Sequence, residues 1–294
     1  MKRSDIHIRD PFVLVHEGRY YLYGTRGKTA WGAASGFDVY VSEDMENWSE
    51  PVPCFENDGS FWASMHYWAP EVHIWQGAFY LFASFLGDGM ERGTAILRAD
   101  SPLGPFLPHS DQCVTPADWA CLDGTLYVDR SGKPWMVFCH EWTQIGNGEI
   151  CAMRLTEDLK AAAGEPRVLW RAQDAPWVVL NRDQAHEGYV TDGPFLWRTQ
   201  GGSLLCLWAS FSKSGYTQGL ARSDNGEIDG HFLHLPPVEM ADAGHGMLFR
   251  DLKGRLWLTL HSPNVHPLEH PHFIHMLDRG DTLACAEDHG AAPS

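Results

Sequence analysis

One hairpin-like unit recurs five times along the 294-residue sequence, and this repetition constrains the fold more than any other feature. Each copy has a small or acidic residue at its start, a short apolar strand, a turn that contains glycine, and a second strand rich in aromatic residues. The turns read HEGR, WQGA, RSGK, TQGG and LKGR. The copies begin 53 to 69 residues apart, at Asp10, Ala69, Leu122, Thr191 and Gly244.

A further hairpin follows most of these copies, such as FDVYVSEDMENWSEP after the first and GTAILRADSPLGPFLPH after the second. The repeating unit therefore has about four antiparallel strands, which is typical of a propeller blade. We predict an all-β, five-bladed β-propeller that forms a single domain over residues 1–294, with a tail that frays after about residue 279. A β-sandwich or a pair of β domains explains the shared layout of the repeats less well.

Composition excludes several classes of partner. The chain has 38 acidic and 22 basic residues and a net charge of -16, so we expect no nucleic-acid or membrane partner. No apolar run approaches the roughly 18 residues of a membrane helix, and no signal peptide is apparent. The seven cysteines include no CxxC pair, which indicates free thiols in a reducing compartment and predicts a cytoplasmic protein. The oligomeric state stays open.

The starts of the five repeats are the place to look for function. In a propeller the first strand of every blade lines the central channel, so residues far apart in sequence converge there. Carboxylates crowded at one axis repel one another, and burial raises the pKa of at least one, which leaves a proton donor beside ionised neighbours. Glycoside hydrolysis needs this pairing of an acid with a base. The residues at the repeat starts are Asp10, Glu71, Asp123, Asp192 and His245.

Five segments together resemble glycoside hydrolase family 43, and they extend over almost the whole chain. They are IRDPFVL, WAPEVHIWQGAFYLFAS, LDGTLYVDRSGKPWMVF, TDGPFLW and GHGMLF. The resemblance implies a five-bladed propeller that hydrolyses arabinose-, xylose- and some galactose-containing glycans with inversion. It also implies that Asp10 is the general base, that Asp123 raises the pKa of the acid and orients it, and that Asp192 is the general acid. His245 would face the channel centre.

The resemblance requires no cofactor, but it allows calcium or another ion at the propeller centre, with His245 as its ligand. A buried, hydrogen-bonded His245 without a metal explains the sequence equally well. The dense histidine cluster HPLEHPHFIH, residues 266–275, has no metalloprotease-like spacing, and its prolines predict a non-catalytic loop.

One position departs from the family pattern, because Asp192 stands where the family usually has Glu. A side chain shorter by one methylene sets the carboxyl back, and such a misplacement can cost about 10²-fold in rate. Either the backbone compensates, or the acid comes from Glu187 or Glu141, or the protein does not hydrolyse glycosides. In isolation, Asp10, Asp123 and Asp192 would each fit a simple turn.

Candidate substrate-binding residues are aromatic or polar side chains near expected strand ends and loops. A flat aromatic face can stack on a sugar ring, although core packing explains any single aromatic residue as well. The candidates are Arg9, Trp31, Phe37, Trp68, Glu71 and Trp142.

The sequence therefore predicts a cytoplasmic, inverting glycoside hydrolase that acts on an oligosaccharide. It would release terminal α-L-arabinofuranosyl or β-D-xylosyl units from plant-type oligosaccharides. The alternatives are a non-hydrolytic sugar-binding propeller whose acid has decayed and a five-bladed glycoside phosphorylase.

Overall fold

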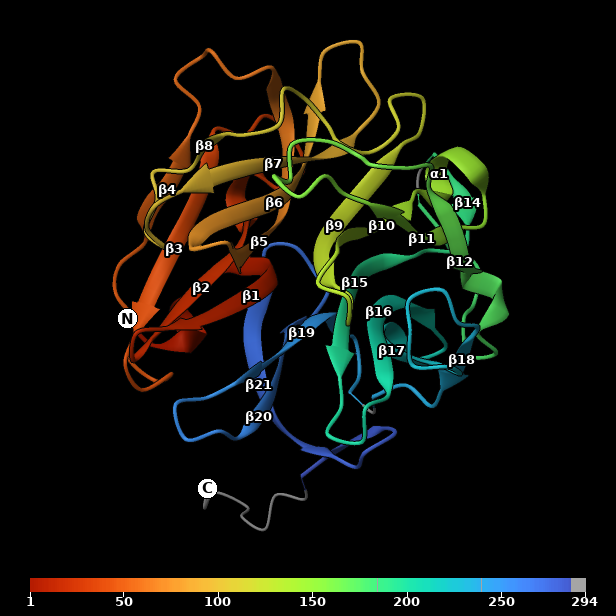
Figure 1. Cartoon of the computed structure of the whole chain (residues 1–294). Coiled ribbons are helices and arrows are strands. Elements are labelled where there is room, and N and C mark those ends of the chain that lie inside the picture. The colour runs from red at the N-terminus through yellow and green to blue at the C-terminus, as the bar shows by residue number, and fades with distance from the viewer. Residues whose placement is uncertain (184, 239, 287–294) are drawn as a thin grey trace.

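The computed structural model describes residues 1–183, 185–238 and 240–286, and these form a ring of five four-stranded antiparallel blades (Figure 1). The predicted all-β, five-bladed propeller is confirmed. Within each blade, neighbouring strands follow chain order, and the first strand lies at the channel. No helix in the described ranges is long and apolar enough to cross a membrane.

The strands of the blades have the following bounds. Blade 1 consists of β1 (Ile8–His16), β2 (Arg19–Arg26), β3 (Gly36–Ser42) and β4 (Val52–Glu56). Blade 2 consists of β5 (Ala63–Trp75), β6 (Ala78–Gly87), β7 (Gly93–Ala99) and β8 (Leu107–Pro108). Blade 3 consists of β9 (Cys121–Val128), β10 (Pro134–His140), β11 (Glu149–Arg154) and β12 (Arg167–Arg171).

The last two blades complete the ring, and a few short elements connect the sheets. Blade 4 consists of β15 (Asp192–Arg198), β16 (Leu204–Ser212), β17 (Gly215–Ser223) and β18 (Phe232–Leu235). Blade 5 consists of β19 (Gly244–Arg250), β20 (Leu256–Ser262), β21 (His270–Asp278) and β22 (Leu283–Cys285). The connecting elements are η1 (Arg3–Asp5), η2 (Gly27–Thr29), α1 (Trp142–Ile145), η3 (Ala172–Asp174), β13 (Asn181–Arg182) and β14 (Glu187–Gly188).

The predicted glycine turns close the inner hairpins. In blade 1, His16 pairs with Arg19, so only Glu17 and Gly18 form the turn, and both have positive φ (46° and 76°). Two left-handed residues in a two-residue loop match the twist of the flanking strands, which is why glycine recurs in these turns.

Every central strand carries the same irregularity near its start. The register with the second strand shifts there, and one residue adopts a left-handed backbone with φ between 48° and 56°. A bulge of this kind re-aims a side chain at the end of a strand. These left-handed residues are Asp10, Ala69, Asp123, Gly193 and His245, and β5 contains a second left-handed residue, His66, with a φ of 51°.

Two expectations about the C-terminal blade are wrong. Residues 283–285 do not fray, because they form β22 and pair with Met276–Asp278 of β21, and Leu283 packs on the core of blade 5. Residues 287–294 of the predicted tail lie outside the described residues. The histidine-rich segment is also not a loop throughout, since residues 270–278 form β21. Pro271 is tolerated in this strand because β22 pairs only with its far end, so no donor is needed on that side.

Candidate active site

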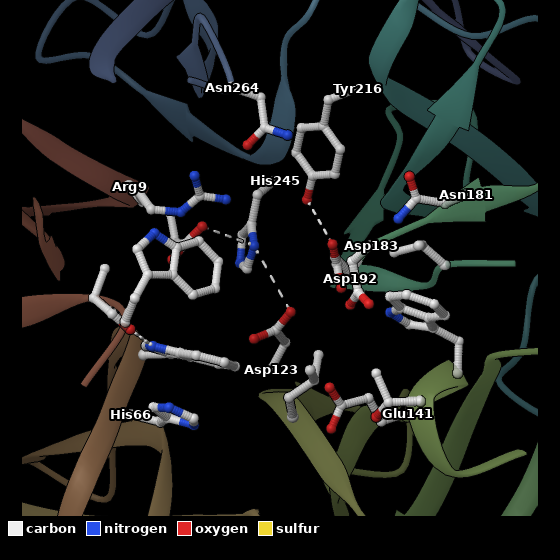
Figure 2. A pocket seen from close by; sticks show the side chains of 18 of the residues that line it. Arg9, His66, Asp123, Glu141, Asn181, Asp183, Asp192, Tyr216, His245 and Asn264 are labelled. Atoms are coloured by element: carbon white, nitrogen blue, oxygen red, sulfur yellow. Dashed lines mark hydrogen bonds and ion pairs between the residues drawn. The ribbon is translucent and has the colours of Figure 1, made fainter. Parts of the chain in front are cut away.

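The channel ends of the central strands surround a cavity of about 550 Å³, and all five blades contribute to its wall. The cavity brings together Asp10, Asp123, Asp192 and His245, from four different blades, as the propeller predicts. Figure 2 shows Asp123 near the centre of this group, between His245 and Glu141, with Asp192 beside it.

Asp10 is held among donors and positive charge. The hydroxyl of Thr25 donates to Oδ2 of Asp10 at 2.6 Å, and Nδ1 of His245 lies 3.1 Å from Oδ1. Burial alone would raise the pKa of this carboxyl, but His245, Arg9 and the Thr25 hydroxyl outweigh burial and hold the pKa below its ordinary value. Asp10 is therefore ionised at neutral pH.

His261 supports the backbone of Asp10. The Asp10 amide donates to Nδ1 of His261 at 3.2 Å, so the ring proton resides on Nε2, which faces Oδ1 of Asn264 at 3.2 Å. Burial and the charge of Arg9 lower the pKa of His261 to about 3, so the ring stays neutral. This contact fixes the left-handed residue at the bulge of β1.

Asp123 has the opposite environment. Burial raises its pKa to about 7, and the nearby carboxylates of Asp192 and Asp10 add to the rise, whereas His245 opposes it. The amide of Gly193 donates to Oδ2 of Asp123 at 2.9 Å, and Nδ1 of His245 lies 3.7 Å from the same oxygen. Asp123 thus links the starts of blades 3, 4 and 5.

Asp192 is half-buried and lies immediately before the left-handed Gly193 of β15. Desolvation in the cavity raises the pKa of Asp192 to about 6, helped by the charges of Asp10 and Glu141. The hydroxyl of Tyr216 donates to Oδ2 of Asp192 at 3.0 Å. Burial also raises the pKa of Tyr216 well above its ordinary value of 10.0, so this hydroxyl remains a donor.

Glycine at position 193 is required by close approach as well as by its positive φ. A Cβ there would lie 2.7 Å from Cδ2 of His245, closer than real Cβ contacts. His245 itself is buried, which lowers its pKa, but Asp10, Asp123 and Asp192 reverse the effect and raise it. The carboxylates around His245 thus favour the protonated form of its ring.

The donors around His245 do not form a preassembled set of protein metal ligands. Within the described ranges, no three His, Cys, Asp or Glu side chains are grouped so that they could hold a metal ion. Asp10 and Asp123 both approach the Nδ1 side of the His245 ring, where they act as ion-pair partners. These residues fit a charge network better than a preassembled ligand set.

A comparison with protein families identifies the family of this chain. The family described as "Glycosyl hydrolases family 43" matches residues 5–279. The chain belongs to this family.

Individual relatives of this family 43 protein are arabinofuranosidases or arabinanases by name. One is an extracellular exo-alpha-(1->5)-L-arabinofuranosidase of Cellvibrio japonicus (strain Ueda107), 26% identical over 273 residues, covering 86% of this chain and 73% of the relative. Another is an extracellular endo-alpha-(1->5)-L-arabinanase of Bacillus subtilis (strain 168), 23% identical over 171 residues, covering 54% of this chain and 52% of the relative. The solved endo-arabinase of Bacteroides thetaiotaomicron VPI-5482 is 40% identical, has a TM-score of 0.89, and covers 94% of this chain and 96% of that chain.

Four of the six predicted substrate-binding residues of this family 43 protein line the cavity: Arg9, Trp31, Trp68 and Trp142. The side chain of Trp31 is 59% exposed, and the guanidinium of Arg9 lies 5.2 Å from its ring centroid. Arg9 also forms an ion pair of 2.6 Å with the buried Glu269. Trp31 therefore presents an accessible aromatic surface in the cavity wall beside Arg9.

Phe37 and Glu71 do not line the cavity, and their prediction as substrate-binding residues is wrong. Phe37 is fully buried in the core of blades 1 and 2, where it packs on Phe55 and Phe85. Glu71 is buried between blades, where it accepts a hydrogen bond of 2.5 Å from the hydroxyl of Thr125. Both residues are structural.

The two alternative acids lie in different places. Glu187, on β14, does not line the cavity, and its exposed side chain pairs with Arg182 at 2.5 Å. Glu141 does line the cavity, but Arg92 holds it in a buried ion pair of 2.5 Å. A carboxylate that is held in an ion pair is a poor proton donor, which favours Asp192.

Sequence reasoning missed several side chains of the cavity wall. Arg92, just before β7, and Tyr216, on the third strand of blade 4, lie where no motif marks them. Asn181 and Asp183 come from the segment between blades 3 and 4. The one available signal was the longer third repeat, whose additional residues form the β13–β14 hairpin beside the cavity.

Proposed function

We propose that this protein is an inverting glycoside hydrolase that releases terminal α-L-arabinofuranosyl units from arabinan-type oligosaccharides. The observation that carries the proposal is the convergence of Asp10, Asp123 and Asp192, from three blades, in one cavity. Their environments push the pKa of Asp10 down and the pKa values of the other two up. Such divergence among neighbouring carboxyls separates a base from an acid.

Asp10 is the proposed general base. It is ionised at the pH where the others hold a proton, and it takes a proton from a water molecule that attacks the anomeric carbon. Asp192 is the proposed general acid, and it gives its proton to the oxygen of the departing sugar. Tyr216 holds Oδ2 of Asp192, so the shorter side chain keeps a defined position.

Asp123 is the proposed positioning residue for the acid. It accepts a hydrogen bond from the amide of Gly193, the residue next to Asp192, and so fixes the start of the strand that carries the acid. Asp123 and Asp192 interact strongly, so their protons leave in steps that belong to the pair. With Asp10 ionised and the pair protonated, activity should be highest below about pH 6 and should fall as pH rises through 6 to 7.

The proposed sugar rests on the relatives' names, which refer to arabinofuranosyl bonds. Release of terminal units is supported by the wall of the cavity, to which every blade and the segment between blades 3 and 4 contribute. No step of the proposed reaction uses a central ion. Family membership favours hydrolysis over the glycoside phosphorylase and over the sugar-binding protein without activity.

A substrate screen with NMR of the released sugar tests the proposal. The 4-nitrophenyl glycosides of α-L-arabinofuranose, β-D-xylose and β-D-galactose are compared with linear α-1,5-arabinan. We expect the arabinofuranoside to be the best aryl substrate, arabinose to be the first product from arabinan, and the β-anomer to appear before mutarotation. Initial release of the α-anomer, or no cleavage of any substrate, would contradict the proposal.

The cytoplasmic location stays a prediction, and the two curated relatives named above are extracellular by name. We retain it as a proposal that supports a role on short oligosaccharides. Fractionation of the producing cell, with activity on the arabinofuranoside as the readout, checks it.

A further inference from the structure

Four side chains outside the acid–base group build one part of the cavity wall. They are His66 and Trp68 on β5, Arg92 just before β7, and Glu141 just after β10. Figure 2 shows His66 and Glu141 on the other side of Asp123 from Tyr216. None of them has a part in the proposed proton transfers.

Contacts within this group fix the protonation of His66. Nη1 of Arg92 lies 2.5 Å from Oε2 of Glu141, and Nη2 of Arg92 lies 2.9 Å from Nδ1 of His66. A guanidinium only donates hydrogen bonds, so Nδ1 of His66 must be the acceptor and the ring proton must reside on Nε2. Burial and the charge of Arg92 lower the pKa of His66 to about 4, so the ring is neutral.

Trp68 supports both His66 and Arg92 on one face. The His66 ring stacks on Trp68 with centroids 4.5 Å apart and an interplanar angle of 12°, and Cζ of Arg92 lies 4.0 Å from the Trp68 ring centroid. Groups on opposite faces of an indole would be roughly 7 Å apart. The 2.9 Å hydrogen bond between His66 and Arg92 therefore places them side by side on the same face.

The backbone of His66 is strained in a way that aims its side chain. His66 has a φ of 51°, which is uncommon for a residue other than glycine, and the register of β5 with β6 shifts on both sides of Met65. The His66 amide donates to the carbonyl of Gly32 at 3.2 Å, which holds this conformation. Strain of this kind persists where the surrounding structure enforces it, often at ligand sites.

The other ring nitrogen of His66 is available to a ligand. Among the described residues, no protein group accepts a hydrogen bond from Nε2, and the side chain lines the cavity. The donor is thus neutral, fixed in one tautomer and one orientation, and directed by a chain of contacts that begins at Glu141. Preorganised donors of this kind provide specificity for a hydroxyl group.

We propose that His66 is a specificity-determining residue whose Nε2–H donates a hydrogen bond to one hydroxyl oxygen of a sugar in the cavity. Trp68, Arg92 and Glu141 are its positioning residues. The inference deepens the proposed function, since it rests on an arabinose-containing oligosaccharide as the ligand.

Calorimetry in the D10N background tests His66 by binding alone, so the result does not depend on turnover. The ligands are methyl α-1,5-arabinobioside and its monodeoxy derivatives, each lacking one hydroxyl. Into D10N we introduce H66A, H66Q, R92K and the control H109A. His109 is a matched control because it is half-buried and packs on an aromatic ring, as His66 does. It contacts a backbone carbonyl and lies outside the cavity.

We expect D10N to bind one monodeoxy ligand about 3- to 10-fold more weakly than the parent bioside, the equivalent of one neutral hydrogen bond. H66A in the D10N background should bind the bioside more weakly than D10N does, by the same factor. It should also bind that one monodeoxy derivative as tightly as the bioside. H66Q, which keeps an N–H donor, should regain part of the discrimination, and R92K should lose a smaller part. H109A should match D10N.

Three results would overturn the inference. If H66A binds the bioside as tightly as D10N does, His66 is not a ligand, although the proposed hydrolysis can still hold. If H66A weakens the binding of the bioside and of all its derivatives by the same factor, the role of His66 is structural. If D10N binds no arabinoside while the wild type cleaves only other glycosides, both the inference and the proposed sugar are wrong.

Discussion

Asp10 and Asp192 begin the central strands of blades 1 and 4 and line the same cavity, yet their pKa values move in opposite directions. Asp10 faces His245 and Arg9 and accepts a hydroxyl hydrogen bond from Thr25, so its charge is stabilised. Asp192 faces other carboxylates across a desolvated cavity, and Tyr216 gives it only partial compensation. The same residue type thus acquires two chemical roles from its surroundings alone.

Removing the charge of Asp10 should have the largest effect on activity. We expect D10N to lower kcat/KM by about 10²–10⁴-fold on every glycoside that the wild type cleaves, because no other ionised carboxylate stands in its place. Initial rates on the 4-nitrophenyl arabinofuranoside provide the measurement. The matched control is D100N, since Asp100 is a highly exposed aspartate outside the cavity, and it should retain wild-type activity. A near-normal rate for D10N would remove the assignment.

Lengthening the side chain at position 192 tests the role of the proposed acid. The hydroxyl of Tyr216 already contacts the carboxyl of Asp192 at 3.0 Å, so the site is built for the shorter side chain. We expect D192E to displace the carboxyl and to lower kcat by about 10- to 10²-fold. Steady-state kinetics on the same substrate measure this. An increase in kcat would instead show that aspartate is a defect at this position.

A smaller effect should follow from Y216F, which removes one hydrogen bond to the ionised form of Asp192. The pKa of Asp192 should then rise above about 6. Because the acid must be protonated, the alkaline limb of kcat/KM should move to higher pH, while the maximal rate falls by about 3- to 10-fold. A pH profile from 4 to 9 measures both. An alkaline limb that moves to lower pH would contradict the assignment of Asp192 as acid.

The repeated hairpins and the residues at their starts could be predicted because each is a local pattern. A glycine turn between two apolar strands indicates a hairpin, and ring closure then brings Asp10, Asp123, Asp192 and His245 together. The segments that carry these residues also carry the resemblance to the family.

Predictions failed where they depended on which way a side chain points. Phe37 precedes Asp38 in β3, and the alternation of a strand sends one into the core and the other outward. Arg92 lies just before β7 and Tyr216 lies on β17, both outside the central strands, so their roles follow from tertiary packing alone.

The dependence of kcat/KM on the leaving group tests the division of roles between Asp10 and Asp192 most directly. Aryl arabinofuranosides with leaving groups of decreasing pKa are compared in the wild type, D10N and D192N. An acid helps most when the leaving group is poor. We predict that D192N approaches wild-type rates with the best leaving group and falls increasingly behind with poorer ones, whereas D10N is slow by a constant factor. A constant factor for D192N, or a recovery of D10N with good leaving groups, would contradict the account.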